Sequence, residues 1–387
     1  MEAYLDNSAT TRPFDSVREI MSETMDLDYG NPSSMHKKGF EAERYIKESR
    51  QKIAASLKAS EKEIIFTSGG TESNNMALIG AAMANRRRGN HLITTSVEHA
   101  SVSNVMAFLE EQGFHITYLP VDSHGTVSLE ALKAALTRET ILVSMMYVNN
   151  EIGSVQPVAE AAKLIHAFDK EIIFHVDAIQ AYGKYRIRPG RMGIDLMSVS
   201  GHKIHGPKGT GFLYVRDKVK IKPIIWGGGQ QDNMRSGTEN VPGIAGLGKA
   251  VEEIYKDHKD KIARMYHMKE ILVEALTGEG GPGGLIINGQ PLNDGAPHIV
   301  SVSFPGIRSE VLLHALEDKG VYVSAGSACS SNHPAISRTL LAIGADKSQL
   351  DSTLRFSFGA FTTEEEVRYA ADCVRELVPG LREFYRH

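Results

Sequence analysis

The chain has 387 residues, of which 42% are hydrophobic and 23% are charged, as is usual for globular proteins with large cores. The formal net charge is −4, from 43 basic and 47 acidic residues, which argues against nucleic acid or an anionic membrane as a partner. Its two cysteines, Cys329 and Cys373, are too few for a disulfide framework. The start MEAYLDNSATTRP lacks a signal-peptide pattern, and no apolar run approaches the roughly 18 residues that cross a bilayer. We therefore expect a cytoplasmic protein.

Between about residues 60 and 216, short apolar or β-branched runs alternate with segments of helical period. The runs are EIIFTS, HLITTS, HITYLPV, ILVSMMYV, IIFHVDA, DLMSVS and GFLYVR. Helices are expected between them, for example over 72–88 and 158–167. This alternation predicts an α/β domain with a mostly parallel, seven-stranded sheet sandwiched by helices, and several runs are apolar throughout, as strands buried on both faces are.

The pattern changes after about residue 258. A long charged helix is followed by the loop GEGGPGG, the strand-like IVSVSF, a helix at SEVLLHALEDKG, and the segments VYVSAGSAC and RFSFGAF. This less regular order of elements predicts a smaller α+β domain. We expect the large domain over 14–258, and the small domain over 1–13 and 259–387.

One lysine has an unusual sequence context. Lys203 lies in SVSGHKIHGPKGTG, between His202 and His205, directly after a strand-like run. Most lysines lie on the surface, and this one could too. Neighbouring cationic groups and partial burial, however, favour the neutral amine that a Schiff-base lysine needs. The glycines that follow would let backbone approach a ligand closely.

Other chemistry-bearing residues also follow predicted strands. In FTSGGTESNN a strand runs through two glycines into a helix, a geometry that attracts phosphate but also occurs in ordinary connections. Asp177 ends a buried run and needs a cationic partner, either a pyridinium nitrogen or a structural salt bridge. His99 could stack on a ring or cap a helix. Since the carboxyl ends of parallel strands share one edge, these groups and Lys203 together predict a pyridoxal 5'-phosphate site.

Motifs along nearly the whole chain carry a family resemblance. They are YLDNSATT, YGNPSSMH, FTSGGTESNN, EHASV, VNNEIG, HVDAIQ, SGHKIHGPKG, RSGTEN, SAGSACSS and RFSFGAFTTEEE. With these motifs the sequence resembles the cysteine desulfurases of the class V aminotransferase superfamily, close to the bacterial type that feeds iron–sulfur cluster assembly. The resemblance implies the pyridoxal phosphate-dependent transferase fold of type I.

The resemblance also implies roles for individual residues. Lys203 would bind the cofactor covalently, Asp177 would pair with its ring nitrogen, and His99 would stack on the ring and transfer protons. The residues implied to contact the cofactor elsewhere are Gln180 at the ring oxygen, Asn150, and Gly70, Thr71, Ser200 and His202 at the phosphate, with Thr238 from the partner subunit of a homodimer. Asn150 and Arg355 would hold the carboxylate of the substrate, for which a planar guanidinium is suited.

The sulfur step is implied to depend on Cys329. A free cysteine is often a buried apolar residue, but the small residues of SAGSACSSN are typical of a mobile loop rather than a core. Cys329 would take sulfur from L-cysteine as a persulfide, leave L-alanine, and pass the sulfur to a protein acceptor. No resident metal is expected, although Cys329 is a candidate transient ligand of an iron–sulfur cluster on a scaffold. Cys373 would be a core or helix-surface thiol.

Alternative functions stay open at this point. A selenocysteine lyase or an aminotransferase would use the same lysine site, although an aminotransferase has no need of the thiol at Cys329. A non-catalytic protein that keeps the cofactor as a structural ligand is a third possibility, against which the intact contexts of Lys203 and Cys329 argue. The acceptor could be an iron–sulfur scaffold, a carrier for tRNA thiolation or another protein.

Overall fold

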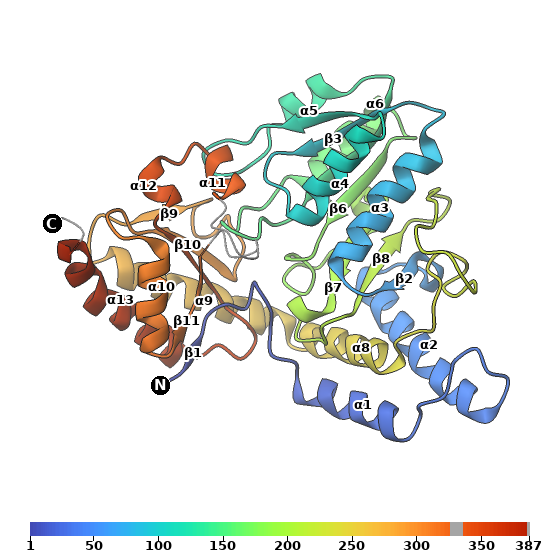
Figure 1. Ribbon diagram of the computed structural model, residues 1–387, viewed down its shortest axis with the longest axis horizontal. Helices are drawn as coiled ribbons and strands as arrows, with labels where there is room; N and C mark the ends of the chain where they lie inside the picture. Colours follow the sequence, from blue (N-terminus) through green and yellow to red (C-terminus); the bar gives the residue numbers. More distant parts are fainter. Residues whose placement is uncertain (326–335, 385–387) are drawn as a thin grey trace.

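The computed structural model describes residues 1–325 and 336–384, which form two unequal halves, each built on its own sheet (Figure 1). The strands of the larger sheet are β2 (Ile64–Thr67), β3 (His91–Thr95), β4 (His115–Leu119), β5 (Thr140–Met146), β6 (Ile173–Asp177), β7 (Leu196–Ser200) and β8 (Gly211–Val215). Their order is β2-β8-β7-β6-β5-β3-β4, and only β8 is antiparallel to its neighbours. The predicted fold class is confirmed, and each of the seven predicted runs forms one strand.

Helices precede, connect and follow these strands. They are α1 (Asp15–Asp26), α2 (Lys37–Leu57), α3 (Gly70–Asn85), α4 (Ala100–Glu111), α5 (Leu129–Ala135), α6 (Val158–Phe168), α7 (Pro189–Met192) and α8 (Val241–Tyr255), with short 3-10 turns η1 (Glu61–Glu63) and η2 (Gly201–Lys203). Helix α3 begins two residues before the predicted start, because Gly69 adopts φ of 148° and turns the chain straight from the strand into the helix. It ends at Asn85, so the basic run at 86–88 lies beyond its last turn.

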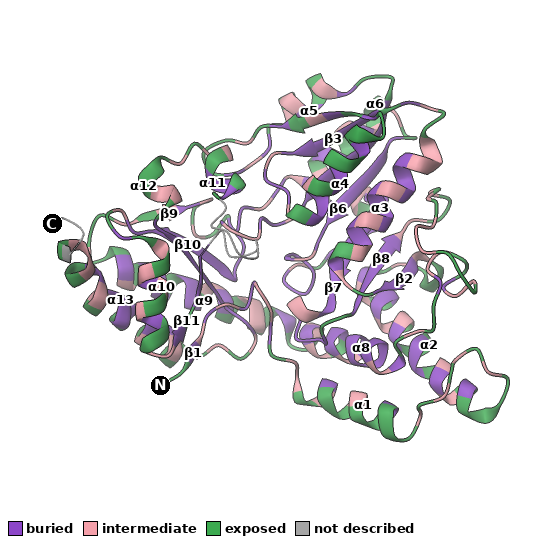
Figure 2. Ribbon diagram, in the orientation of Figure 1, coloured by how far each residue is buried: buried purple, intermediate pink, exposed green. Residues whose placement is uncertain are grey.

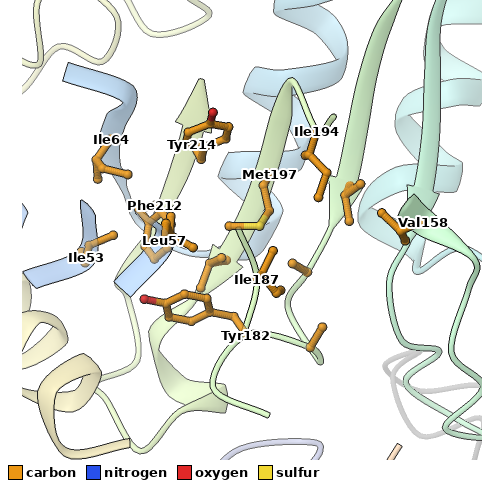
Figure 3. Packing of buried hydrophobic residues seen from close by; sticks show 14 of the residues in the cluster. Ile53, Leu57, Ile64, Val158, Tyr182, Ile187, Ile194, Met197, Phe212 and Tyr214 are labelled. Carbon is orange, nitrogen blue, oxygen red and sulfur yellow. The ribbon is translucent and has the colours of Figure 1, made fainter. Parts of the chain in front are cut away.

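Alternating side chains of the larger sheet pack into two hydrophobic clusters, one on each face. On β7 and β8, Leu196 and Leu213 face the cluster that contains α3 and α4, whereas Met197 and Phe212 face the cluster that contains α2, α6 and α8. Figure 3 shows Leu57 of α2 and Phe212 of β8 within the second cluster. Apart from the edge strand β4, the strands are therefore buried on both faces, and only their ends are available for a site (Figure 2).

The smaller half joins the N-terminal residues to the C-terminal part of the chain. Its antiparallel sheet has the order β12 (Ser324–Ala325), β13 (Thr353–Ser357), β10 (Ile299–Ser303) and β9 (Ile286–Asn288), while β1 (Ala3–Tyr4) pairs in parallel with β11 (Val321–Tyr322). The helices of this half are α9 (His258–Thr277), α10 (Ser309–Asp318), α11 (Arg338–Ala342), α12 (Lys347–Leu350) and α13 (Glu364–Phe384). Ala3 and Leu5 belong to the hydrophobic cluster of this half. The domain boundaries at residues 13 and 258 stay a prediction.

None of the helices in the two described ranges is both long and apolar enough to cross a membrane.

Candidate active site

A cavity of about 210 Å³ lies at the carboxyl ends of β2, β3, β5, β6 and β7. It is lined by Ser8, Ala9, Gly70, Thr71, His99, Ser101, Met146, Val148, Asn150, Asp177, Ile179, Gln180, Ser200, His202, Lys203 and Arg355. The structure thus brings together all the predicted site residues except Thr238 and Cys329. Cys329 lies outside the described residues, so its predicted role stays a prediction.

Asp177 is the buried acid of the cavity, and only 4% of its surface is exposed. Its Oδ2 accepts a hydrogen bond from Asn74 Nδ2 at 2.9 Å, and its Oδ1 accepts from the backbone N–H of Ile179 at 3.0 Å. Burial raises the pKa of Asp177, while these hydrogen bonds and the charges of His99 and Lys203 oppose the rise. A buried carboxylate of this kind is stabilised by a cation placed against it. A protonated pyridine nitrogen would be such a cation.

His99 caps α4 with a defined tautomer. The backbone N–H of Ser101 donates to His99 Nδ1 at 3.1 Å, so Nδ1 is an acceptor and the neutral ring carries its proton on Nε2. Ser101 Oγ lies 2.8 Å from the same Nδ1 and accepts from Asn74 Nδ2 at 2.8 Å. Burial, followed by Lys203, lowers the pKa of His99, whereas Asp177 raises it. Asn74 therefore links the acid and the imidazole, a role that the sequence analysis missed although Asn74 lies one turn after Gly70.

Lys203 reaches the cavity from η2, directly after β7. Its Nζ donates to the carbonyl oxygens of Ser8 at 2.5 Å and Ala9 at 2.7 Å. Thr11 ties this N-terminal segment to the same turn, because its Oγ1 donates to the carbonyl of His202 at 2.8 Å and accepts from the backbone N–H of His205 at 2.8 Å. The motif at residues 4–11 thus forms one wall of the cavity.

Small and neutral groups form the corner where a phosphate was predicted. A Cβ atom on Gly70 would lie 2.2 Å from Ile179 Cδ1, so a larger residue at the start of α3 would displace that side chain from the wall after β6. The backbone N–H groups of a helix start attract an anion. Burial and then Lys203 lower the pKa of the neighbouring His202 to about 4, so the ring is neutral at pH 7 and its Nδ1 lies 3.2 Å from Thr10 Oγ1. These residues fit a phosphate.

Arg355 enters the cavity from the middle of β13 in the smaller half. It is 4% exposed, and its guanidinium donates to Asp6 Oδ1 at 2.9 Å and to the carbonyl of Asn150 at 2.7 Å. Its buried Nε has no hydrogen-bond partner within the part of the chain that the structure describes. A buried donor without an acceptor, next to a single carboxylate, suits the carboxylate of a small substrate.

Gln180 is held from two sides. Its Nε2 donates to the carbonyl of Ser8 at 3.0 Å, and its Oε1 lies 3.2 Å from Nε2 of the buried His298. With the amide oxygen turned to His298, the amide nitrogen lies on the cavity side, as the predicted contact with a ring oxygen would need. His298 carried no signal in the sequence, because it lies in an apolar run far from Gln180.

The two remaining residues of interest lie elsewhere. Thr238 lines a separate hollow with Arg235 and Asn240, outside the cavity of its own chain, so its predicted contact across a dimer stays a prediction. Cys373 is 4% exposed and packs in the hydrophobic cluster of the smaller half, as a structural thiol does.

The arrangement of groups matches the chemistry of pyridoxal phosphate. One cavity holds an amine, a buried acid that needs a cation, a neutral anion-binding corner and a guanidinium. These groups surround a single cavity of about 210 Å³, which suits small ligands.

Comparisons with known proteins agree with this geometry. Residues 3–369 match the family model of the class-V aminotransferases. The chain is 42% identical to the cysteine desulfurase IscS of Dictyoglomus turgidum, with 98% of this chain and 95% of the relative aligned, and 43% identical to a putative cysteine desulfurase IscS 1 of Bacillus subtilis, with 98% and 99% aligned. The solved structure of a NifS-like protein superimposes with a TM-score of 0.92 at 39% identity, covering 98% of this chain and 100% of that one. The chain therefore belongs to the class-V aminotransferase family and, within it, to the cysteine desulfurases.

Proposed function

We propose that the protein is a pyridoxal phosphate-dependent cysteine desulfurase, which converts L-cysteine to L-alanine and transfers the sulfur to Cys329 as a persulfide. The observation that carries the proposal is that Lys203, the buried Asp177 and Arg355 line one small cavity. An amine, an acid and a carboxylate-binding guanidinium are the groups that cofactor and amino acid together require. The solved structure of SspA in complex with cysteine, 35% identical over 93% of this chain, supports the choice of amino acid.

When bound, pyridoxal phosphate supplies an electron sink for negative charge at the substrate α-carbon. Asp177 would hold the proton on the ring nitrogen and so maintain that sink, which matches its burial and its need for a cation. Gly70, Thr71, Ser200 and His202 would hold the phosphate, and Gln180 would donate to the ring oxygen. Because burial keeps the ring of His202 uncharged, this ring would contact the phosphate by hydrogen bonding and not by charge.

The substrate is oriented by the smaller half and deprotonated from the larger one. Arg355, with Asn150 beside it, would bind the substrate carboxylate through its guanidinium, since both residues line the cavity. The amine of Lys203 would take the proton from the α-carbon and return one when alanine forms. His99, whose Nε2 carries the proton in the neutral ring, would donate and accept protons at the substrate sulfur.

The sulfur transfer is balanced by one bond made and one bond broken. The thiolate of Cys329 attacks the substrate sulfur, so the Cβ–S bond of cysteine breaks while an S–S bond forms on the enzyme. The electron pair of the broken bond stays with the substrate carbon, which is then protonated to give the methyl group of alanine. Reduction of the persulfide by a thiol releases sulfide in the absence of an acceptor.

The assay for this function measures two products. Purified protein with pyridoxal phosphate, L-cysteine and a thiol reductant is expected to release sulfide and alanine in equal amounts. Cys329→Ala should release neither, whereas Cys373→Ala, a matched control on the other cysteine, should keep both. Formation of pyruvate or another keto acid in place of alanine would refute desulfuration, and sulfide release at the wild-type rate from Cys329→Ala would refute the persulfide step.

The wider setting of the reaction is also part of the proposal. The protein would be a cytoplasmic homodimer in which Thr238 contacts the phosphate in the partner's cavity, since Thr238 does not line the cavity of its own chain. The sulfur acceptor would be a protein such as an iron–sulfur scaffold, as the resemblance of the sequence motifs implies. Sedimentation measures the dimer, and transfer of radiolabelled sulfur to candidate acceptors identifies the partner.

A further inference from the structure

Lys184 is a buried amine that the mechanism above does not use. It follows the turn after β6, and its side chain is buried, with 6% of the residue exposed. Its Nζ donates to the carbonyl oxygen of Lys203 at 2.5 Å. Among the described residues, the charge that acts on Lys184 is that of Lys203, and no carboxylate offsets it. A buried lysine without an acidic partner is costly and calls for a reason.

The local backbone is shaped to bring Lys184 under Lys203. Gly183 adopts φ of 81°, and a Cβ atom there would lie 2.8 Å from Ile204 Cγ2. Only glycine therefore lets this turn lie directly against the turn that carries Lys203 and Ile204. Lys184 is fixed at the same place, because its backbone N–H donates to the carbonyl of Ala181 at 3.0 Å.

The surroundings of the two lysines are rich in nitrogen bases. Six titratable or charged groups face them, and these come from five elements: Asp177 on β6, His99 before α4, His202 and His205 around η2, His298 before β10, and Arg355 on β13. Two lysines farther out, Lys208 and Lys261, act on His202 and His205. Asp177 is the acid among these groups whose charge acts on Lys203.

We propose that Lys184 is a positioning residue for Lys203. Its Nζ holds the carbonyl oxygen of Lys203 by a hydrogen bond, and its positive charge favours the unprotonated side-chain nitrogen of Lys203. This inference rests on the proposed function, in which Lys203 carries the cofactor. A cation close to a lysine disfavours a second positive charge, which is one of the ways in which an amine is made nucleophilic. Burial, followed by the charge of Lys203, lowers the pKa of Lys184 to about 7. The second contribution disappears when residue 203 is uncharged, so Lys184 holds its proton more strongly in that state.

The test is a pH titration of the visible absorption band of the holoenzyme, which reports the protonation of the nitrogen that joins Lys203 to the cofactor. In Lys184→Met, which removes the charge and the donor, the midpoint is expected about one pH unit higher than in the wild type, because the positive charge that opposed protonation is gone. Lys184→Gln keeps a donor without the charge and should shift the midpoint in the same direction.

Lys269→Met is the matched control. Lys269 is equally buried and also donates to a carbonyl, but that carbonyl is the one of Ala296, at 3.0 Å, and not that of Lys203. Lys269→Met should lower the unfolding temperature and leave the midpoint of the absorption band unchanged. If Lys184 had only a structural role, Lys184→Met would give this same result. Midpoints of Lys184→Met and Lys184→Gln that superimpose on the wild type overturn the inference.

The titration distinguishes a failure of the proposed function from a failure of the role of Lys184. A wild-type protein that shows no visible band after loading with pyridoxal phosphate would refute the proposed function. A normal wild-type band that does not shift in the Lys184 variants would refute only the role of Lys184. Lys184→Gln retains hydrogen-bonding capacity at the buried position, so it serves when the methionine variant does not fold.

Discussion

The two sheets contribute to the cavity in different ways. The larger sheet offers the ends of its strands, from which Asp177 and the turn with Lys203 reach the cavity. The smaller sheet offers Arg355 from the middle of β13, paired directly with Ser301 of β10 and Ser324 of β12. A parallel sheet that is covered on both faces has free side chains only at its edge, whereas an antiparallel sheet can point a side chain from its face into a neighbouring cavity.

This difference separates cofactor chemistry from substrate recognition. The groups suited to hold a cofactor come from the rigid larger half, where burial sets their protonation states. The guanidinium suited to hold the substrate comes from the smaller half, and it is held by Asp6 of the N-terminal segment. Changes in the larger half should therefore affect cofactor binding and kcat, while changes to Arg355 should affect KM.

The largest effect is expected from Lys203→Ala. Without the amine, the holoenzyme should lose its visible absorption band, and alanine formation should fall by about four orders of magnitude, because both the covalent attachment and the proton transfer at the α-carbon are lost. Absorption spectra and product assays measure the two effects. Lys208→Ala, an exposed lysine five residues further on, is the control and should keep both. An unchanged spectrum in Lys203→Ala would exclude the assignment.

Asp177→Asn tests the acid of the larger half. We expect kcat to fall about a thousandfold, because a neutral amide cannot hold the proton on the ring nitrogen. Without cofactor the same variant should be more stable at pH 7 by about 1–3 kcal/mol, because it removes a buried carboxylate whose pKa is raised by burial. Denaturant unfolding of the cofactor-free and loaded forms measures this. Equal destabilisation of both forms would show that Asp177 has only a structural role.

Arg355→Gln tests the contribution of the smaller half. The loss of a charged donor to the substrate carboxylate should raise KM about a hundredfold, with a smaller change in kcat, since a charge-assisted pair contributes roughly 2–3 kcal/mol. Steady-state kinetics with L-cysteine separate the two constants. Arg308→Gln, which removes an exposed arginine of the same half, should leave both unchanged. A fall in kcat without a rise in KM in Arg355→Gln would contradict the assignment of substrate binding to the smaller half.

The smallest effect concerns stability at low pH. Burial lowers the pKa of His175 to about 3, where it bridges Ser144 and Ser198 across three strands. The unfolded chain binds a proton at this residue below about pH 6.5, whereas the folded chain does not. The free energy of unfolding should therefore fall by about 1.4 kcal/mol per pH unit for this one histidine as the pH falls from about 6 to 4. In His175→Gln the slope should be smaller by that amount, and parallel denaturation profiles would contradict the assignment.

Much of the site could be predicted because its residues occur in local patterns. Gly70, Asp177 and Lys203 follow apolar runs, and the edge rule for parallel strands then places them together. The residues that hold them could not be predicted in this way. Asn74 links Asp177 to Ser101, and His298 faces Gln180 across 118 positions, and neither contact leaves a pattern in the sequence.

The sequence by itself determined the alternation of strands and helices, the seven strands of the larger sheet and the chemistry of their ends, because hydrophobic period and strand length are local properties. Only the tertiary structure decided that the segment 4–11 closes the cavity, that Arg355 is paired with Asp6, and that Lys184 lies beneath Lys203. The first two contacts join residues that are distant in sequence, and the third depends on the turn at Gly183. Tertiary packing determines such contacts, and local sequence preference does not.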